Sequence, residues 1–156
     1  MKFIRTISRA ALIAMAVSLL AVAAVAQEKK ITGKDVPAAV ISAFKTAYPN
    51  ATIRGYAREK ENGKVFYEIE SREGTTTRDV LYNPDGTVAE IEESIAVTDL
   101  PAEVQQAMKE KFPKAAITKA ERTTAGDKVS YEIVARQGKK RVTIEFDSSG
   151  KMLTKK

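Results

Sequence analysis

The sequence predicts an α+β fold made of two tandem copies of one unit, each a helix followed by a four-stranded antiparallel sheet. Three observations support this prediction: an internal repeat, an amphipathic helical stripe at the start of each copy, and a later change to two-residue periodicity with regularly spaced turns. Joined side by side, the two units are expected to form one eight-stranded sheet with both helices on one face.

The repeat is visible directly in the sequence. Residues 31–89 align with residues 95–153 without a gap, and about a third of the aligned positions are identical. Asp-Val-Pro-Ala recurs as Asp-Leu-Pro-Ala, Tyr-Pro returns as Phe-Pro, and Tyr-Glu-Ile occurs in both copies. These identities fall at helix ends, strands and turns, so they indicate a duplicated structural unit.

The N-terminal segment has the pattern of an export signal. Lys2, Arg5 and Arg9 precede an apolar run, and small residues precede Gln27. The apolar run is shorter than the roughly 20 residues that a membrane span needs. We therefore expect cleavage after Ala26, a periplasmic or secreted protein and no stable membrane insertion. The predicted division is a signal peptide at 1–26, a first repeat at 27–94 and a second repeat at 95–156.

Each unit is predicted to begin with a helix. In the first unit Pro37 suits a helix start because the φ angle of proline is already fixed, and Asp35 adds negative charge there. Val40, Phe44 and Tyr48 follow at intervals of four residues and form one apolar stripe, which Pro49 then ends. The equivalent residues of the second unit are Asp99, Pro101, Val104, Met108, Phe112 and Pro113.

Three turn signals divide the rest of each unit into four strands. In the first unit these are Asn62-Gly63, Gly74 and the Asn-Pro-Asp-Gly segment that ends at Gly86. In the second unit they are Gly126-Asp127, Gly138 and the Ser-Ser-Gly segment that ends at Gly150. Consecutive hairpins produce an antiparallel meander, which excludes the parallel βαβ folds that bind nucleotides.

Alternation along the strands predicts which side chains face the helices. These are Val65, Tyr67, Ile69, Val80 and Tyr82 in the first unit, and Val129, Tyr131, Ile133, Val142, Ile144 and Phe146 in the second. The opposite face is expected to stay uncovered. In the second unit its predicted residues are Thr118, Ala120, Arg122, Ser130, Glu132, Val134, Thr143 and Glu145.

The uncovered face of the first unit is the predicted binding surface. Tyrosine, phenylalanine and arginine are the residue types that anchor protein interfaces. We predict partner contacts at Arg54, Tyr56, Arg58, Phe66, Glu68, Glu70 and Leu81. The alternative is a solvated sheet on which arginine and glutamate side chains pair across strands.

The sequence holds no recognisable catalytic apparatus. It contains neither histidine nor cysteine, which removes the triad mechanisms, disulfides and the usual zinc ligands. Glu68, Glu70 and Asp79 are the carboxylates from which a divalent-cation site or acid–base chemistry would have to be built. We expect no enzyme activity, no cofactor and no specific metal site.

The charge of the chain argues against general nucleic-acid binding. The formal net charge is +6, but Lys2, Arg5 and Arg9 belong to the predicted signal peptide, so the remainder is nearly balanced. A protein that binds nucleic acid through its phosphates carries a concentrated basic surface instead.

The repeated Asp-Val/Leu-Pro-Ala segment, the aromatic-Pro helix end and the Tyr-Glu-Ile hairpin resemble the PepSY-like domains, and more narrowly the β-lactamase-inhibitor-like group of PepSY-like proteins. The resemblance extends from Ile31 to the C-terminus in two copies. It implies an exported bacterial protein whose tandem helix-plus-sheet units hold a partner protein on the concave face of the sheet. No inhibitory residue can be transferred, because no matching motif is present.

Together these observations predict an exported, non-enzymatic binding module that recognises an envelope or extracellular protein through the uncovered face. The alternative is a sensor or buffer of small molecules or divalent cations in the cell envelope, built on the carboxylates of the first unit.

Overall fold

The computed structural model describes residues 27–155, so the predicted export signal at 1–26 lies outside the described residues. Two α-helices, two short 3-10 helices and nine strands make up this part of the chain. In chain order they are β1 (Gln27–Lys30), η1 (Gly33–Asp35), α1 (Ala38–Ala47), β2 (Thr52–Glu61), β3 (Lys64–Glu73), β4 (Thr76–Tyr82), β5 (Val88–Ile95), η2 (Val97–Asp99), α2 (Ala102–Lys111), β6 (Ala116–Ala125), β7 (Lys128–Gln137), β8 (Lys140–Asp147) and β9 (Met152–Lys155).

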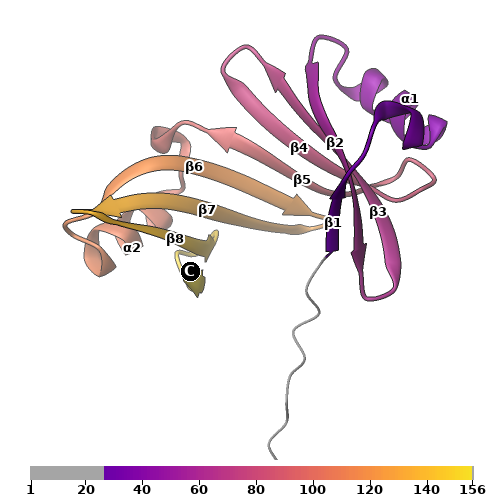
Figure 1. Ribbon diagram of the computed structural model, residues 1–156. Helices are drawn as coiled ribbons and strands as arrows, with labels where there is room; N and C mark the ends of the chain where they lie inside the picture. The colour runs from indigo at the N-terminus through magenta and orange to yellow at the C-terminus, as the bar shows by residue number, and fades with distance from the viewer. Residues whose placement is uncertain (1–26, 156) are drawn as a thin grey trace, which may run out of the picture.

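All strands belong to one antiparallel sheet in chain order from β1 to β9 (Figure 1). This confirms the predicted α+β fold and the antiparallel meander. The predicted number of eight strands is one too low, because β1 adds a strand outside β2. None of the described helices has the length and apolar character needed to cross a membrane.

Strand β1 is explained by the repeat. Lys30 of β1 pairs with Ala57 of β2, and the aligned residue Ser94 of β5 pairs with Glu121 of β6. Strand β5 is therefore both the last strand of the first unit and the first strand of the second. The predicted boundary between residues 94 and 95 falls at the end of this shared strand.

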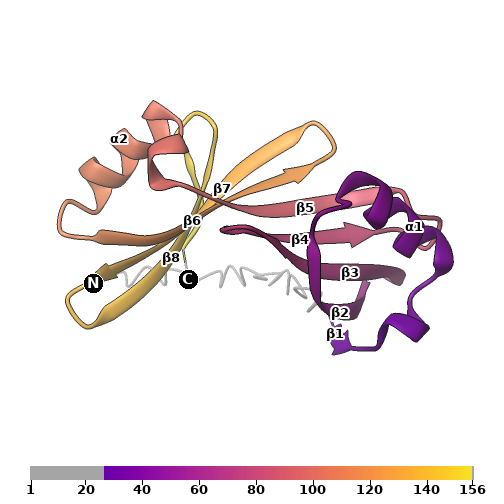
Figure 2. The ribbon, with the colours of Figure 1, turned by 90° about the horizontal axis from the view of Figure 1, so that it is seen from above.

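Each helix covers its own half of the sheet (Figure 2). Val40 and Phe44 of α1 pack with Ile69, Val80 and Tyr82, all at most 1% exposed. The second cluster has the same plan, with its buried residues Val104 and Met108 from α2 and Ile133, Ile144 and Phe146 from the sheet.

Strand β5 shows that both helices lie on the same face. Ile91 packs against the cluster under α1, and Ile95 packs against the cluster under α2. Residues four apart on a strand point to the same side of a sheet. The predicted placement of both helices on one face is therefore confirmed.

The helix ends follow the sequence signals with one difference. Tyr48 ends α1 and donates its backbone N–H to the carbonyl of Phe44 at 2.8 Å, directly before Pro49. Asp35, however, lies in η1, where it accepts hydrogen bonds from the backbone and hydroxyl of Thr32 at 3.0 and 2.8 Å. Its carboxylate therefore caps η1 rather than α1.

Two turns dock against the helices. Gly86 has a φ angle of +86°, and a Cβ atom on it would lie 2.8 Å from the carbonyl oxygen of Ala39. Gly150, its equivalent, approaches the carbonyl oxygen of Glu103 in the same way. The glycine shared by the two copies thus allows the loop before the last strand of each unit to contact its helix.

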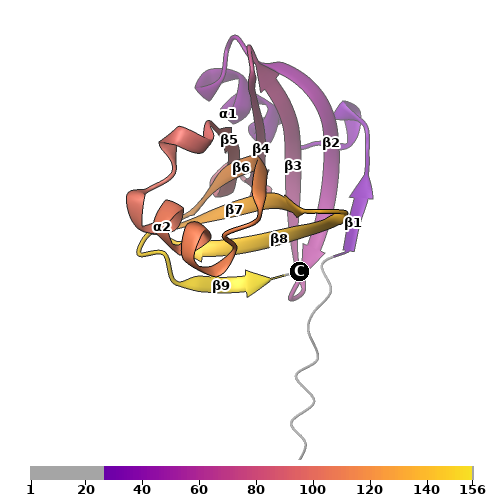
Figure 3. The ribbon, with the colours of Figure 1, turned by 90° about the vertical axis from the view of Figure 1, so that its left-hand side faces the viewer.

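The sheet is strongly twisted. Strands β2 to β4 run across the direction of β7 to β9 when the molecule is viewed from its side (Figure 3). Twist is the ordinary consequence of right-handed strand geometry. It turns the uncovered side of the sheet into a hollowed surface.

Candidate functional site: the open face of the sheet

The open face is the side of the sheet opposite α1 and α2. The buried side chains of Ile69 and Val80 point toward α1, so their neighbours Glu68, Glu70, Asp79 and Leu81 point to the other side. Following the strand register outward from these residues places the remaining side chains. The carboxylates of the open face are Glu28, Glu59, Glu61, Glu68, Glu70, Asp79, Glu90, Glu92, Glu121, Glu132, Glu145 and Asp147.

A β-bulge overturns part of the predicted binding surface. The register of β2 against β3 shifts between Ile53 and Gly55, so Arg54 is an extra residue at the bulge. Beyond it Tyr56 pairs with Ile69, and its ring packs in the core cluster under α1. The predicted position of Tyr56 on the open face is therefore wrong.

Arg58 is corrected for the same reason. It pairs with Tyr67 and so lies on the helix-covered side, where its side chain is exposed near Asp35. Arg54 is exposed at the bulge itself. Strict two-residue alternation fails at a bulge, because one extra residue reverses the direction of every side chain that follows.

The second unit repeats the bulge at the aligned position. The register of β6 shifts between Ile117 and Lys119, with Thr118 as the extra residue. Ala120 and Arg122, predicted on the open face, therefore lie on the helix side, and Ala120 is buried in the core. Lys119 and Glu121 take their places on the open face.

The register places the other predicted partner-binding residues, Phe66, Glu68, Glu70 and Leu81, on the open face. Their role in binding stays a prediction. The sequence analysis missed Glu59 and Glu121 because of the bulges. It also missed Glu90 and Glu92 on β5, although the pattern Glu-Ile-Glu at 90–92 is the signal that would have found them.

Carboxylates outnumber cations on the corrected open face, where the same register also places Lys30, Arg72, Lys119, Lys128, Arg136 and Arg141. Within the described residues, only two of its carboxylates form ion pairs: Glu70 with Lys30 at 3.5 Å and Glu121 with Lys119. Glu121 is 5% exposed, and its neighbours Glu92 and Glu132 form no ion pair among the described residues. Most carboxylates of the open face therefore lie near one another without a directly paired cation.

This crowding raises the pKa of several carboxyl groups. Burial raises the pKa of Glu68 to about 8, helped by a hydrogen bond with Glu59 and by the charges of Asp79, Glu59 and Glu28. Burial likewise raises the pKa of Glu92 to about 7, together with the charge of Glu121, a hydrogen bond with it and the charges of Glu132 and Asp79.

Asp79 and Glu90 shift in the same direction. Burial and the charges of Glu70 and Glu121 raise the pKa of Asp79, against an opposing effect of Lys119. Burial and the charges of Glu59, Glu61 and Glu145 raise the pKa of Glu90. A carboxyl group whose pKa is raised in this way gains charge when a cation approaches, because the cation stabilises the ionised form.

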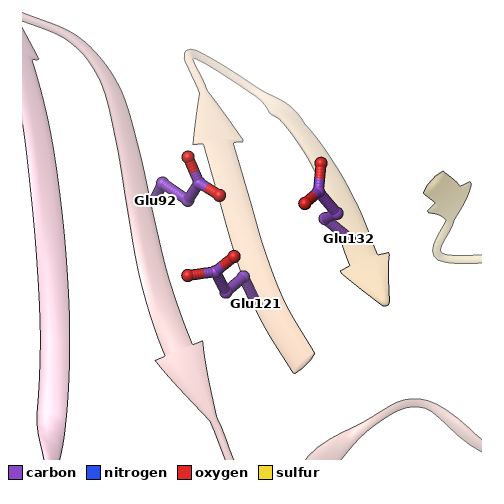
Figure 4. Close-up of side chains that lie close together, drawn as sticks. All are labelled: Glu92, Glu121 and Glu132. Atoms are coloured by element: carbon purple, nitrogen blue, oxygen red, sulfur yellow. The ribbon is translucent and has the colours of Figure 1, made fainter. Parts of the chain in front are cut away.

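Three of these carboxylates converge where the two units join. Glu92 of β5, Glu121 of β6 and Glu132 of β7 each place a carboxylate oxygen within 4.8 Å of the others (Figure 4). In the first unit the aligned residues are Glu28, Ala57 and Glu68. The second unit therefore has three carboxylates at these positions, whereas the first unit has two, because Ala57 stands where the second unit has Glu121.

Two adjoining hollows run across the open face. One, of about 570 Å³, lies over β5 to β9 and is lined by Glu90, Glu92, Glu132 and Glu145, with Leu153 at its margin. The other, of about 230 Å³, is lined mainly by carboxylates of β1 to β5 and by Leu81. Glu90 and Glu92 line both, so the two hollows form one groove.

Solved structures share this architecture. A "putative periplasmic" protein of Bacteroides eggerthii is 18% identical, with a TM-score of 0.64 over 78% of this chain and 88% of its own. A DUF2874 family protein of Bacteroides ovatus is 17% identical, with a TM-score of 0.61 over 78% and 86%. A BLIP-like protein of Bacteroides fragilis is 21% identical, with a TM-score of 0.59 over 78% and 85%.

No curated protein matches the sequence. The family model described as "Putative beta-lactamase-inhibitor-like, PepSY-like" matches residues 23–88 and again residues 66–154. The two matches together cover both repeats, in agreement with the duplicated fold. This chain belongs to the β-lactamase-inhibitor-like, PepSY-like family.

Proposed function

We propose that this protein is an exported, non-enzymatic binding module that recognises another protein through its open face. The observation that carries the proposal is the asymmetry of the sheet. One side is sealed by α1 and α2, whereas the other presents a continuous groove over β1 to β9 with no covering element among the described residues. Binding sites are characteristically concave.

Two further observations support binding over catalysis, and a third concerns the location of the protein. The chain has no histidine or cysteine to act as a base or nucleophile. The solved structure from Bacteroides fragilis is described as BLIP-like, and the family takes its name from an inhibitor of an enzyme. The export pattern at 1–26 agrees with the description of the Bacteroides eggerthii protein as periplasmic, so the proposed location is the periplasm or the cell exterior.

Phe66 and Leu81 provide a test of the open face. They are the half-buried apolar side chains among its carboxylates. The tagged wild-type chain and the Phe66→Ala/Leu81→Ala variant would be expressed in the exporting cell, crosslinked and purified, and captured proteins compared by quantitative mass spectrometry. We expect specific partners of the wild type to be lost from the variant.

Val97→Ala is the matched control. Val97 is 40% exposed but lies in η2, away from the open face. The control should retain every partner of the wild type. If the open-face variant also retained them all, or if the control lost them equally, recognition through the open face would be wrong.

A second candidate function is divalent-cation binding in the envelope. The close approach of Glu92, Glu121 and Glu132 favours it, since hard cations such as Ca²⁺ prefer several carboxylate oxygens. Calorimetric titration with Ca²⁺ and Mg²⁺ should give heat for the wild type and none for Glu121→Ala, which reproduces Ala57 of the first unit. Equal heats, or none with either protein, would remove this candidate.

A further inference from the structure

The chemistry of the groove also indicates which kind of protein it holds. We propose that its occupant is a cationic polypeptide segment, lying along the open face with a lysine or arginine side chain in the hollow over β5 to β9. This inference rests on the proposed function and specifies its partner. It is carried by the charge, the shape and the mixed lining of the groove.

Most carboxylates of the groove form no ion pair with the part of the chain that the structure describes. Glu68, Asp79, Glu90, Glu92 and Glu132 have no ion-pair partner among the described residues, and Lys128 is the cation that lines the larger hollow, at the rim near the β6–β7 turn. Complementary potentials guide recognition between proteins. A groove of uncompensated carboxylates therefore favours a basic partner and repels an acidic one.

The shape and lining favour a side chain over a bare ion. The larger hollow has a volume of about 570 Å³, far more than one metal ion fills, and Ala125, Val129 and Leu153 line it alongside Glu132 and Glu145. Lysine and arginine place an apolar stem against such surfaces and present the charge at its end. An extended segment also fits a groove that crosses strands spaced about 4.8 Å apart.

The protonation of the carboxyl groups adds a measurable consequence. Glu92 faces Glu121, Glu132, Asp79 and the Lys119–Glu121 ion pair, and its pKa is raised to about 7. Glu68 faces Glu59, Asp79 and Glu28, and its pKa is raised to about 8. A cation stabilises the ionised form of such groups, so its binding at neutral pH should displace protons into solution.

The test uses a defined probe with the exported full chain. The probe is a capped peptide of alternating lysine and alanine, about twelve residues long and so ~40 Å when extended. The same peptide with glutamate in place of lysine, and CaCl₂ alone, are the comparison ligands. Binding is measured by isothermal titration calorimetry at pH 7 in PIPES and in Tris, whose different ionisation heats report proton release.

We expect the lysine peptide to bind, to weaken as NaCl is raised and to release protons. The Glu92→Gln/Glu132→Gln variant should weaken binding by roughly tenfold or more and release fewer protons. The charge-matched control is Glu103→Gln/Glu110→Gln, because both residues are exposed on α2, on the far side of the sheet. It should bind like the wild type.

Three results would overturn the proposal: no binding of the lysine peptide at low salt, equal weakening in both double variants, or binding of Ca²⁺ or the glutamate peptide in its place. Thermal unfolding shows whether each variant is folded. The Glu92→Gln/Glu132→Gln variant should fold, because glutamine removes repulsion between neighbouring carboxylates. If the Phe66→Ala/Leu81→Ala variant loses its cellular partner while Glu92→Gln/Glu132→Gln keeps it, protein recognition stands and the cationic partner is wrong.

Discussion

At the scale of single residues, backbone contacts and carboxyl groups determine how the sheet is joined to its helices and how the open face is charged. Gly86 and Gly150 allow two loops to touch the first turns of α1 and α2. Glu68 and Glu92 hold their protons to unusually high pH because burial and neighbouring carboxyl groups disfavour the charged form. The glycine contacts and the raised pKa values can each be tested by substituting a single residue.

Gly86→Ala should lower the free energy of unfolding by about 2–4 kcal/mol, because the positive φ angle and the carbonyl of Ala39 both oppose a Cβ atom. Gly74→Ala is the control. Gly74 also has a positive φ angle, but nothing lies within 4 Å of the added atom, so the cost should be roughly 1–2 kcal/mol. Urea unfolding measures both, and equal losses would contradict the role assigned to the helix contact.

The stability of the protein should fall as the pH rises from about 5 to 9. The pKa of Glu68 is 4.5 unfolded and about 8 folded, so between these values the folded state holds a proton that the unfolded state has lost. This stabilisation is complete below pH 4.5 and disappears as the pH passes about 8. Glu90, Glu92 and Asp79 act in the same direction.

Glu68→Gln removes one ionising group from this network. At pH 9 the variant should therefore be more stable than the wild type, on the order of 1 kcal/mol after allowance for solvent screening. The difference should shrink toward pH 5. Urea unfolding at several pH values measures it, and the exposed Glu110→Gln of α2 should show no such trend. A constant difference for Glu68→Gln would refute the assigned shift.

At the scale of elements, the paired bulges in β2 and β6 decide which side chains reach each face. Ile53 and Ile117 point toward the helices just before the bulges. Because each bulge inserts one residue, the next side chains that point toward the helices are Tyr56 and Ala120, three positions later instead of two. Because both copies have the bulge at the same place, it belongs to the unit itself. The faces beyond it are therefore assigned by register and not by counting from the strand start.

Tyr56→Ala tests the face assignment of β2. Since the Tyr56 ring packs in the core cluster and lies against Gly33, the variant should lose about 2 kcal/mol of stability. Arg58→Ala, on the same strand and side but exposed, should change stability by less than about 0.5 kcal/mol. The readout is again urea unfolding. If the Tyr56→Ala protein unfolded like the wild type, the assignment of Tyr56 to the helix-covered side of the sheet would be wrong.

At the scale of the whole molecule, the shared strand β5 and one ion-pair group join the two units. Glu93 accepts hydrogen bonds from Arg78 of the first unit and, at 2.9 Å, from Arg122 of the second. Arg78 also lies over the ring of Tyr48 at 4.2 Å from its centre. A single cooperative unfolding transition follows from this shared framework.

Glu93→Gln should destabilise the molecule by about 1–3 kcal/mol, because the Arg78 side chain is only 12% exposed and would lose its closest anionic partner. Arg122→Ala should cost under about 1 kcal/mol, because that side chain is 48% exposed. Urea unfolding of the two variants, each compared with the wild type, measures both costs. If both variants lost the same stability, the exposed Arg122–Glu93 pair would account for the stabilisation, and the largely buried Arg78–Glu93 pair would add none.

The duplicated unit, its helices, its turns and its antiparallel meander can all be predicted from the amino-acid sequence. These follow from local signals: the apolar stripe at Val40 and Phe44, and glycines at reversals such as Gly63 and Gly138. Alternation of apolar and polar residues also identified the core residues Ile69 and Ile133. These residues lie on β3 and β7, whereas the bulges lie on the neighbouring strands β2 and β6.

The composition of the open face, in contrast, depends on how the strands pair in three dimensions. A bulge leaves no clear mark in one sequence, because it depends on which partner residue each backbone group meets across the strands. The register places Glu121 directly opposite Glu132 and diagonally beside Glu92, so carboxylates from three strands meet in the shared groove. Proximity between carboxylates, and hence their raised pKa, is a property of register and curvature that local sequence patterns do not contain.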